Sequence, residues 1–205
     1  MTTYATLTQD IQDWQEDDNS EFVANIDNFI AMAEERIFRD VPFMPQNRFS
    51  NTGNLSSGTA TLAMPSGVRN IRSISITVSS STVVLQQRLD SYLQDAYPTS
   101  ATTGQPKYYS IQSDTSLLFA PTPDSAYAYE VLAYKKPTGL SSGNTTTWLS
   151  TNAEDILLFS CLVEATGYLQ QPEESAVWEA RYQTALSSLQ SEMMRTLGNE
   201  NTVGV

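Results

Sequence analysis

The spacing of apolar residues changes twice along this 205-residue chain. Residues 3–15 and 20–41 carry apolar side chains at intervals of three and four, which is the spacing of one helical face. In the middle of the chain the interval falls to two, as in "RSISITV", where Ile74, Ile76 and Val78 alternate with serine and threonine. Helical spacing returns in the last quarter. We therefore expect an α+β protein, a bundle of N- and C-terminal helices with an inserted antiparallel β-sheet domain.

Local stop and start signals predict where these parts meet. Pro42 and Pro45 end the second helical segment, because proline lacks an amide donor and its ring clashes with the preceding turn. Thr151 and Glu154 have the spacing of a capping box, and Gly198 is a typical helix terminator. The expected division is a helical bundle of residues 1–41 and 150–197, a β domain of residues 42–149 and a flexible C-terminal tail of residues 198–205.

The stretch "GQPKYYSIQSDTSLLFAPTPD", residues 104–124, is typical of a β-hairpin. We predict strands over 107–112 and 116–119, joined by the polar turn "SDTS". Pro121 and Pro123 would prevent the second strand from extending, since proline cannot donate to a neighbouring strand. The aromatic residues of this stretch are thus explained by a hairpin without any chemistry.

Acidic residues outnumber basic ones by 23 to 11, which gives a formal charge of -12. A protein that wraps nucleic acid needs Lys and Arg for the phosphates, so specific DNA binding is not expected. The charge is uneven: residues 1–35 have nine acids and no base, residues 36–149 have six acids and nine bases, and residues 150–205 have eight acids and two bases. Either the helices simply carry solvated carboxylates, or the molecule has two electrically distinct ends that suit different partners.

The side chains that usually carry catalysis are scarce. The chain has no histidine, the commonest general base and metal ligand. The paired acids Asp17 with Asp18 and Glu173 with Glu174 fall in a polar loop and at a helix start, where solvated or capping roles explain them. Cys161 lies in the apolar run "DILLFSCLVEA", which indicates an inert buried thiol. We expect no enzymatic activity, no cofactor and no metal site.

Targeting signals are also missing from the sequence. The first ten residues, "MTTYATLTQD", lack the basic and apolar regions of a signal peptide. No apolar stretch approaches the ~20 residues that span a bilayer. We expect a chain that is made in the cytoplasm and does not associate with membranes.

The chain has ten tyrosines and three tryptophans, which could form a sugar-binding or base-stacking surface. Most of them fall on apolar stripes and are predicted to be buried: Trp14, Tyr92, Tyr127, Tyr129, Trp178 and Tyr182. Trp148 is different because it lies in a polar Ser/Thr segment. It is either an anchor folded back on its own chain or a contact for a partner, and Tyr108 is a second candidate for a subunit contact.

Five segments together resemble a known family. They are "FIAMAEERIFRD" (29–40), "YP" followed by "GQPKYYSI" and "LLFAPTPD" (97–124), "YAYEVLAYKKP" (127–137), "WLS" (148–150) and "VWEARYQTAL" (177–186). In order and spacing they are similar to the head-to-tail adaptor proteins of tailed bacteriophages, also called connector, tubular tail or head-completion proteins. The similarity runs from residue 3 to residue 190.

The resemblance implies a structural virion protein without enzymatic activity. Family members assemble as a ring, typically a dodecamer, between the portal protein and the tail nozzle protein, and extend the channel through which DNA passes without specific binding. An acidic channel wall would repel phosphate and reduce sticking. We expect the free chain to be monomeric.

Site residues follow from the same resemblance. C-terminal segments of the family dock into the portal, which implies a docking role here for Leu189, Met193, Arg195, Leu197, Val203 and Val205. The β domain would face the tail, and Tyr108 and Trp148 are the candidate subunit or tail contacts.

Two rival functions stay open from the sequence. A carbohydrate-binding module of a virion or cell surface would use exposed aromatic residues such as Tyr108 or Trp148. A carboxylate-based hydrolase would need two acids that face one cleft.

Overall fold

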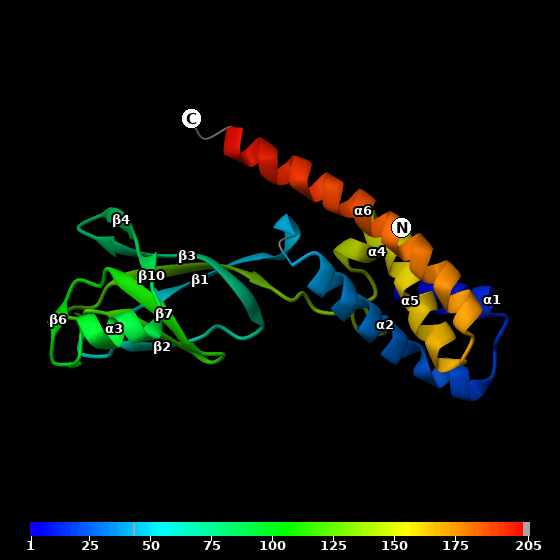
Figure 1. The fold of residues 1–205 in the computed structure, drawn as a ribbon, viewed down its shortest axis with the longest axis horizontal. Coiled ribbons are helices and arrows are strands. Elements are labelled where there is room, and N and C mark those ends of the chain that lie inside the picture. The colour runs from blue at the N-terminus through cyan, green and yellow to red at the C-terminus, as the bar shows by residue number, and fades with distance from the viewer. Residues whose placement is uncertain (43, 203–205) are drawn as a thin grey trace. The chain divides into compact units, whose positions relative to one another are not determined.

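A computed structural model of the chain describes residues 1–42 and 44–202, with side chains as far as Thr196. The fold is α+β, with 45% helix and 27% strand. Along the chain, helices come first and last, and an antiparallel sheet region is inserted between them in sequence, as the colours of Figure 1 show. This is the class that the change of apolar period predicts.

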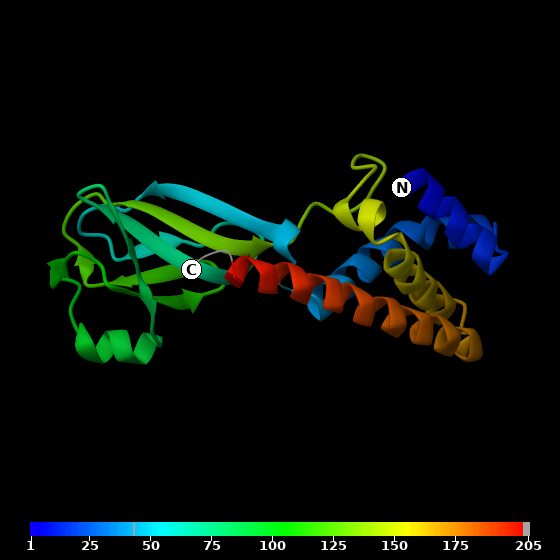
Figure 2. The same cartoon turned by 90° about the horizontal axis from the view of Figure 1, so that it is seen from above.

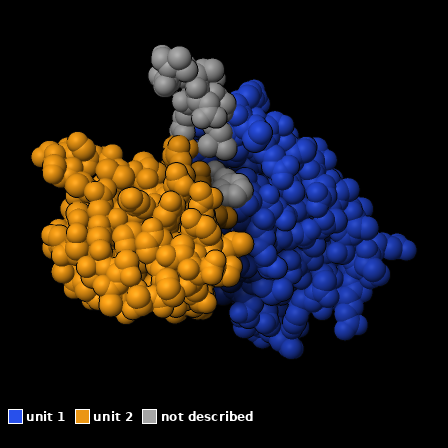
Figure 3. All heavy atoms as spheres, turned by 60° about the vertical axis from the view of Figure 1, so that its left-hand side comes forward, with its two compact units in different colours: residues 1–46, 137–205 blue, residues 47–136 orange. Residues whose placement is uncertain are grey.

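The chain divides into two compact units (Figure 3), the helical unit of residues 1–46 and 137–205 and the β unit of residues 47–136. The sequence placed the inserted domain at 42–149, so the segments on either side of the β unit differ from the expectation. Met44, Leu140 and Leu149 explain the difference, because all three are buried in the core of the helical unit. Apolar burial therefore assigns these connecting segments to the helices.

Five helices form the helical unit: α1 (Tyr4–Gln15), α2 (Ser20–Asp40), α4 (Trp148–Asn152), α5 (Glu154–Tyr168) and α6 (Pro172–Thr202). Helix α5 packs against the other four (Figure 1). Its buried residues lie on nearly every side, as expected for a helix that is apolar all round: Ile156, Leu157, Ser160, Cys161, Leu162, Ala165 and Thr166.

The helix ends are set by local chemistry. Thr3 caps α1 and exchanges hydrogen bonds with Thr6. The expected capping box at Thr151 and Glu154 is wrong, because Trp148–Asn152 forms a separate helix that is capped by Thr147. Helix α5 begins at Glu154, directly after that short helix, without a side-chain cap.

Helix α6 is longer than the sequence predicts. It continues to Thr202, so Gly198 does not terminate it and the described part of the expected flexible tail is helical. A glycine inside a helix costs only about 1 kcal/mol relative to alanine, and no proline follows to stop the helix.

The β unit contains two four-stranded sheets. The first is fully antiparallel, in the order β1 (Arg48–Asn54), β10 (Ala128–Lys135), β3 (Val68–Val78) and β4 (Ser81–Val84). The second has the order β2 (Thr61–Ala63), β8 (Ser116–Ala120), β7 (Tyr108–Ser113) and β5 (Gln86–Gln87), of which β5 and β7 are parallel. A small parallel pair joins β6 (Thr103–Gly104) to β9 (Thr122–Pro123).

Between the sheets lies a second apolar core, made of Leu55, Ile74, Ile76, Leu85, Tyr109, Leu117, Phe119, Val131 and Ala133. Ile74 and Ile76 belong to it, as their alternation predicts. Helix α3 (Asp90–Ala96) packs on β7 and lies outside the two sheets (Figure 2). The short 3₁₀ helix η1 (Pro45–Asn47) precedes β1.

Candidate interaction surfaces

The β unit has a recess of about 660 Å³ where the chain passes from β5 into α3. It is lined by Gln87, Arg88, Leu89 and Tyr92, and we call it the Arg88 recess. Leu89 is 77% exposed and Tyr92 is 46% exposed, so two large apolar side chains flank one arginine at the surface. Tyrosine and arginine are among the residues that carry most of the binding energy in protein interfaces.

The Arg88 guanidinium is held in place by aromatic rings. Its central carbon lies 5.7 Å from the ring centroid of Tyr92 and 5.8 Å from that of Tyr108, and one nitrogen donates to the Gln86 side chain at 3.0 Å. The Arg88 backbone N–H donates to the Tyr109 carbonyl at 2.9 Å, which ties the recess to β7. The guanidinium is therefore positioned before any ligand arrives.

Tyr108, the first predicted contact residue, lies beside this recess. Its half-buried ring is 5.9 Å from the ring of Tyr92, edge to face, and 6.4 Å from the ring of Tyr97. Tyr92 was expected to be buried, and this is wrong. Helix α3 has only seven residues and buries Leu93, which leaves the ring of Tyr92 on the open side.

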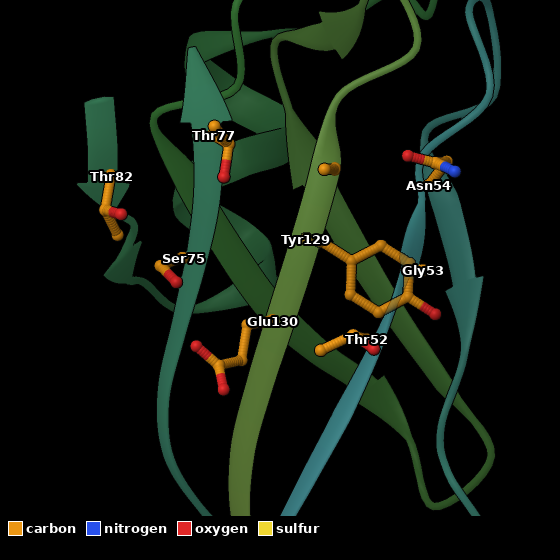
Figure 4. Close-up of a pocket in the computed structure, with 9 residues that line it drawn as sticks. Thr52, Gly53, Asn54, Ser75, Thr77, Thr82, Tyr129 and Glu130 are labelled. Atoms are coloured by element: carbon orange, nitrogen blue, oxygen red, sulfur yellow. The ribbon is translucent and has the colours of Figure 1, made fainter. Parts of the chain in front are cut away.

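The open face of the first sheet carries a polar recess of about 460 Å³ (Figure 4). Hydroxyl groups from three strands line it, together with Glu130, whose carboxylate accepts from the Ser50 hydroxyl at 2.7 Å. The ring of Tyr129 lies beside Gly53 at the same recess (Figure 4). One carboxylate among hydroxyls can accept hydrogen bonds, but a hydrolase of the paired-carboxylate kind needs a second acid, and Glu130 is the only acid among the described residues that line this recess.

In the helical unit, a recess of about 360 Å³ lies between α5 and α6. The Arg181 guanidinium sits 4.8 Å above the ring of Trp178 and 5.9 Å from that of Phe159. The ring of Trp14 meets Trp178 edge to face at 5.2 Å, yet Trp14 is 47% exposed. Its predicted burial is wrong, because α1 ends one residue later at Gln15 and leaves that side uncovered.

The residues considered for chemistry are dispersed. Cys161 is completely buried, and burial raises the pKa of its thiol. None of the three recesses is lined by the acid pairs at 17–18 and 173–174. Among the described residues there is no group of three or more Cys, Asp or Glu side chains that could hold a metal ion. No helix within the described part of the chain is long and apolar enough to cross a membrane.

The predicted docking residues of the C-terminal segment fall into three groups. Leu189 and Met193 are 5% and 4% exposed and belong to the helical core, because the apolar stripe of α6 is used for packing within the unit. Their part in docking stays a prediction, since their side chains already serve the core of the helical unit. Arg195 is exposed, next to Met194, which is 70% exposed. The side chain of Leu197 and the residues Val203 and Val205 lie outside the described part of the chain.

Trp148, the second predicted contact residue, is half-buried and packs against the helical core at the start of α4. This packing corresponds to the anchor alternative. The sequence did not single out Arg88 or Leu89. Their signal is "QQRLD", an exposed cation and leucine between a strand and a helix, which becomes a recess only when β7 brings Tyr108 beside it.

Comparison with known proteins finds one family that matches nearly the whole chain. A protein-family model described as SU10 adaptor protein matches residues 2–203. The family is one of phage head-tail adaptors. No curated protein matches the chain.

Proposed function

The chain belongs to the SU10 adaptor protein family, and from this we propose that copies of it form a ring between the portal protein and the tail nozzle protein and extend the DNA channel. The general role follows from membership of the family. The chain is a structural adaptor of the phage virion that associates with other head and tail proteins. A structural family of this kind suggests that it is not an enzyme.

The distribution of charge supports a channel role. The helical unit has 18 acidic and four basic residues, a net charge of -14, whereas the β unit has five acidic and seven basic residues, a net charge of +2. A strongly acidic unit repels the phosphates of passing DNA, and the nearly neutral unit is free to contact other proteins. The two units thus suit different neighbours.

We propose the C-terminal end of α6 as the part that docks into the portal. Met194 and Arg195 are exposed on it, whereas Leu189 and Met193 are engaged in the helical core. Leu197, Val203 and Val205 complete the proposed docking segment by sequence. An exposed apolar residue beside a cation can bind a groove on a partner without loss of the helical core.

Electron microscopy of the full chain mixed with its cognate portal tests the proposal. We expect a ring of density on the tail-facing end of the portal, and a truncation after Met193, which keeps the helical core intact, should remove it while the rest of the chain stays folded. The free chain should scatter light as a monomer. A stable ring without the portal would contradict the monomer, and a portal without added density would contradict the adaptor position.

The rival carbohydrate-binding function has weaker support. Tyr108 is engaged with two other tyrosine rings and Arg88, and Trp148 packs on the helical core, so neither presents a free ring face of the kind on which sugars stack. Glycan binding that is lost on Tyr108→Ala or Trp148→Ala would favour the rival.

A further inference from the structure

We infer that the Arg88 recess binds the acidic turn at the end of α1, residues 13–18, of a second copy of this chain. The inference rests on the proposed ring and names the surfaces that join neighbouring copies. Two exposed surfaces of opposite charge support it, one in the β unit and one in the helical unit.

In the described part of the chain, Arg88 forms no ion pair. No carboxylate among the described residues pairs with it, although its guanidinium is held over two tyrosine rings. A guanidinium that is already oriented loses little freedom when it binds a carboxylate, and it offers two parallel N–H donors. Leu89 and Tyr92 beside it are exposed apolar surface that a protein partner would cover.

The acidic turn has the matching chemistry. Residues 13–18, "DWQEDD", hold four carboxylates and no base, and no described lysine or arginine forms an ion pair with any of them. In their midst the ring of Trp14 is 47% exposed. A tryptophan flanked by acids complements an arginine flanked by leucine and tyrosine.

A protein fits this recess better than DNA does. Duplex binding relies on several lysines and arginines that contact successive phosphates, whereas the recess offers Arg88 beside apolar side chains. The two surfaces lie in different units and differ in composition. A contact between unlike surfaces of identical copies is heterologous, and such contacts generate a ring when the rotation from copy to copy closes.

Zero-length cross-linking tests the contact directly. Arg88→Lys keeps the positive charge and supplies an amine that a carbodiimide can couple to a carboxylate. We would mix the full-length variant in isotopically light and heavy forms, alone at high concentration and bound to the cognate portal. Mass spectrometry should then find light-to-heavy peptides that join position 88 to residues 13–18. Arg72→Lys, on an exposed arginine of β3, is the matched control and should give few such pairs.

Charge reversal provides the second measurement. We expect Arg88→Glu to weaken assembly on the portal about tenfold or more, as for a central interface residue. The combination with Asp13→Lys, Asp17→Lys and Asp18→Lys should restore it, and restoration separates a lost contact from a misfolded chain. If the wild type does not assemble on the portal but the cross-link forms in solution, the proposed ring fails while the contact stands.

Three results would overturn the inference. The first is the absence, in both samples, of light-to-heavy pairs between position 88 and residues 13–18. Cross-links that join these residues only within one copy count as the same result. The second is full assembly of Arg88→Glu on the portal. The third is binding of a labelled DNA duplex, followed by fluorescence anisotropy, that depends on Arg88, since this would assign the recess to phosphate.

Discussion

Arg36 on α2 donates from one guanidinium nitrogen to both carboxylate oxygens of Glu179 on α6, at 2.6 and 2.7 Å. The same guanidinium lies 4.3 Å above the ring of Tyr182, whose hydroxyl donates to Asp40 at 2.5 Å. Arg36 and Asp40 of α2 therefore bind side chains on two neighbouring turns of α6. This cluster sets the position of α6 along α2 more narrowly than apolar packing alone would do.

The ion pair predicts a pH dependence. Partial burial opposes ionisation of Glu179, but hydrogen bonds from Arg36 and Gln183 outweigh it, so its pKa lies below the ordinary value of 4.5. A carboxylate with a lowered pKa stabilises the fold above that value, and this stability is lost as the pH falls through the folded-state pKa. Glu179→Gln should cost about 0.5 to 1 kcal/mol at pH 7, because the pair is partly exposed, and almost nothing in strong acid.

Tryptophan fluorescence during urea unfolding is a suitable measurement for this variant. All three tryptophans, Trp14, Trp148 and Trp178, belong to the helical unit and report on it alone. Glu192→Gln, on an exposed carboxylate of the same helix, is the control and should leave the unfolding free energy unchanged. A Glu179→Gln penalty that is the same at pH 7 and pH 3 would show that the carboxylate charge is not involved.

The buried hydrogen bond of the Tyr182 hydroxyl predicts that removal of this hydroxyl lowers the free energy of unfolding. It is completely buried, and its hydroxyl bonds to the carboxylate of Asp40. Tyr182→Phe should destabilise the helical unit by about 1.5 to 3 kcal/mol, the usual range for a hydrogen bond to a charged group. Tyr168→Phe removes a hydroxyl that is 3.4 Å from Glu21 on a 41% exposed residue, and it should cost less than about 0.5 kcal/mol. Equal costs in thermal melts would refute the role of burial.

The Glu34 carboxylate fixes the segment that follows the β unit, and this predicts the effect of its removal. Its buried carboxylate accepts the backbone N–H of Leu140 with both oxygens at 3.1 Å. Glu34→Ala would leave this buried donor without an acceptor, at a cost of about 1 to 3 kcal/mol. Hydrogen exchange at the Leu140 amide should become much faster, while amides in the middle of α5 change only with global stability. Unchanged protection of Leu140 would mean that another acceptor holds it.

Much of the fold could be predicted where burial follows a regular period. The stripe of α2 and the alternation of β3 lie in the two cores, and the hairpin at 104–124 forms as β7 and β8. Strand β1, "RFSNTGN", was missed because it is polar and rich in asparagine. Its conformation comes from pairing with β10 at all seven residues, a long-range contact that leaves no local signal.

The candidate site was less predictable than the fold. The sequence indicated Tyr108 as a contact, but the recess beside it depends on Arg88 and Tyr92, which β5 and α3 supply. Trp14 and Tyr92 have helical spacing and yet are exposed, because each lies on a short helix that is covered on one side. Spacing identifies the side that can be buried, and only the tertiary packing decides which residues are covered.

The close approach of Gly53 and Tyr129 predicts a steric effect of a larger residue at position 53 in the β unit. It lies opposite Tyr129 in the pairing of β1 with β10, and a Cβ added there would come within 2.8 Å of the tyrosine hydroxyl oxygen and 2.9 Å of the ring. Gly53→Ala should cost about 1 to 3 kcal/mol, because the ring must leave the strand surface and release its hydrogen bond to Asn51.

Since the β unit has no tryptophan, hydrogen exchange of the β10 amides is the measurement for this variant. Gly143→Ala, in the helical unit and with the nearest atom 4.0 Å away, should leave the exchange of the β10 amides unchanged. Tyr129→Leu in the same chain should remove most of the Gly53→Ala penalty, and strictly additive effects of the two changes would contradict the clash.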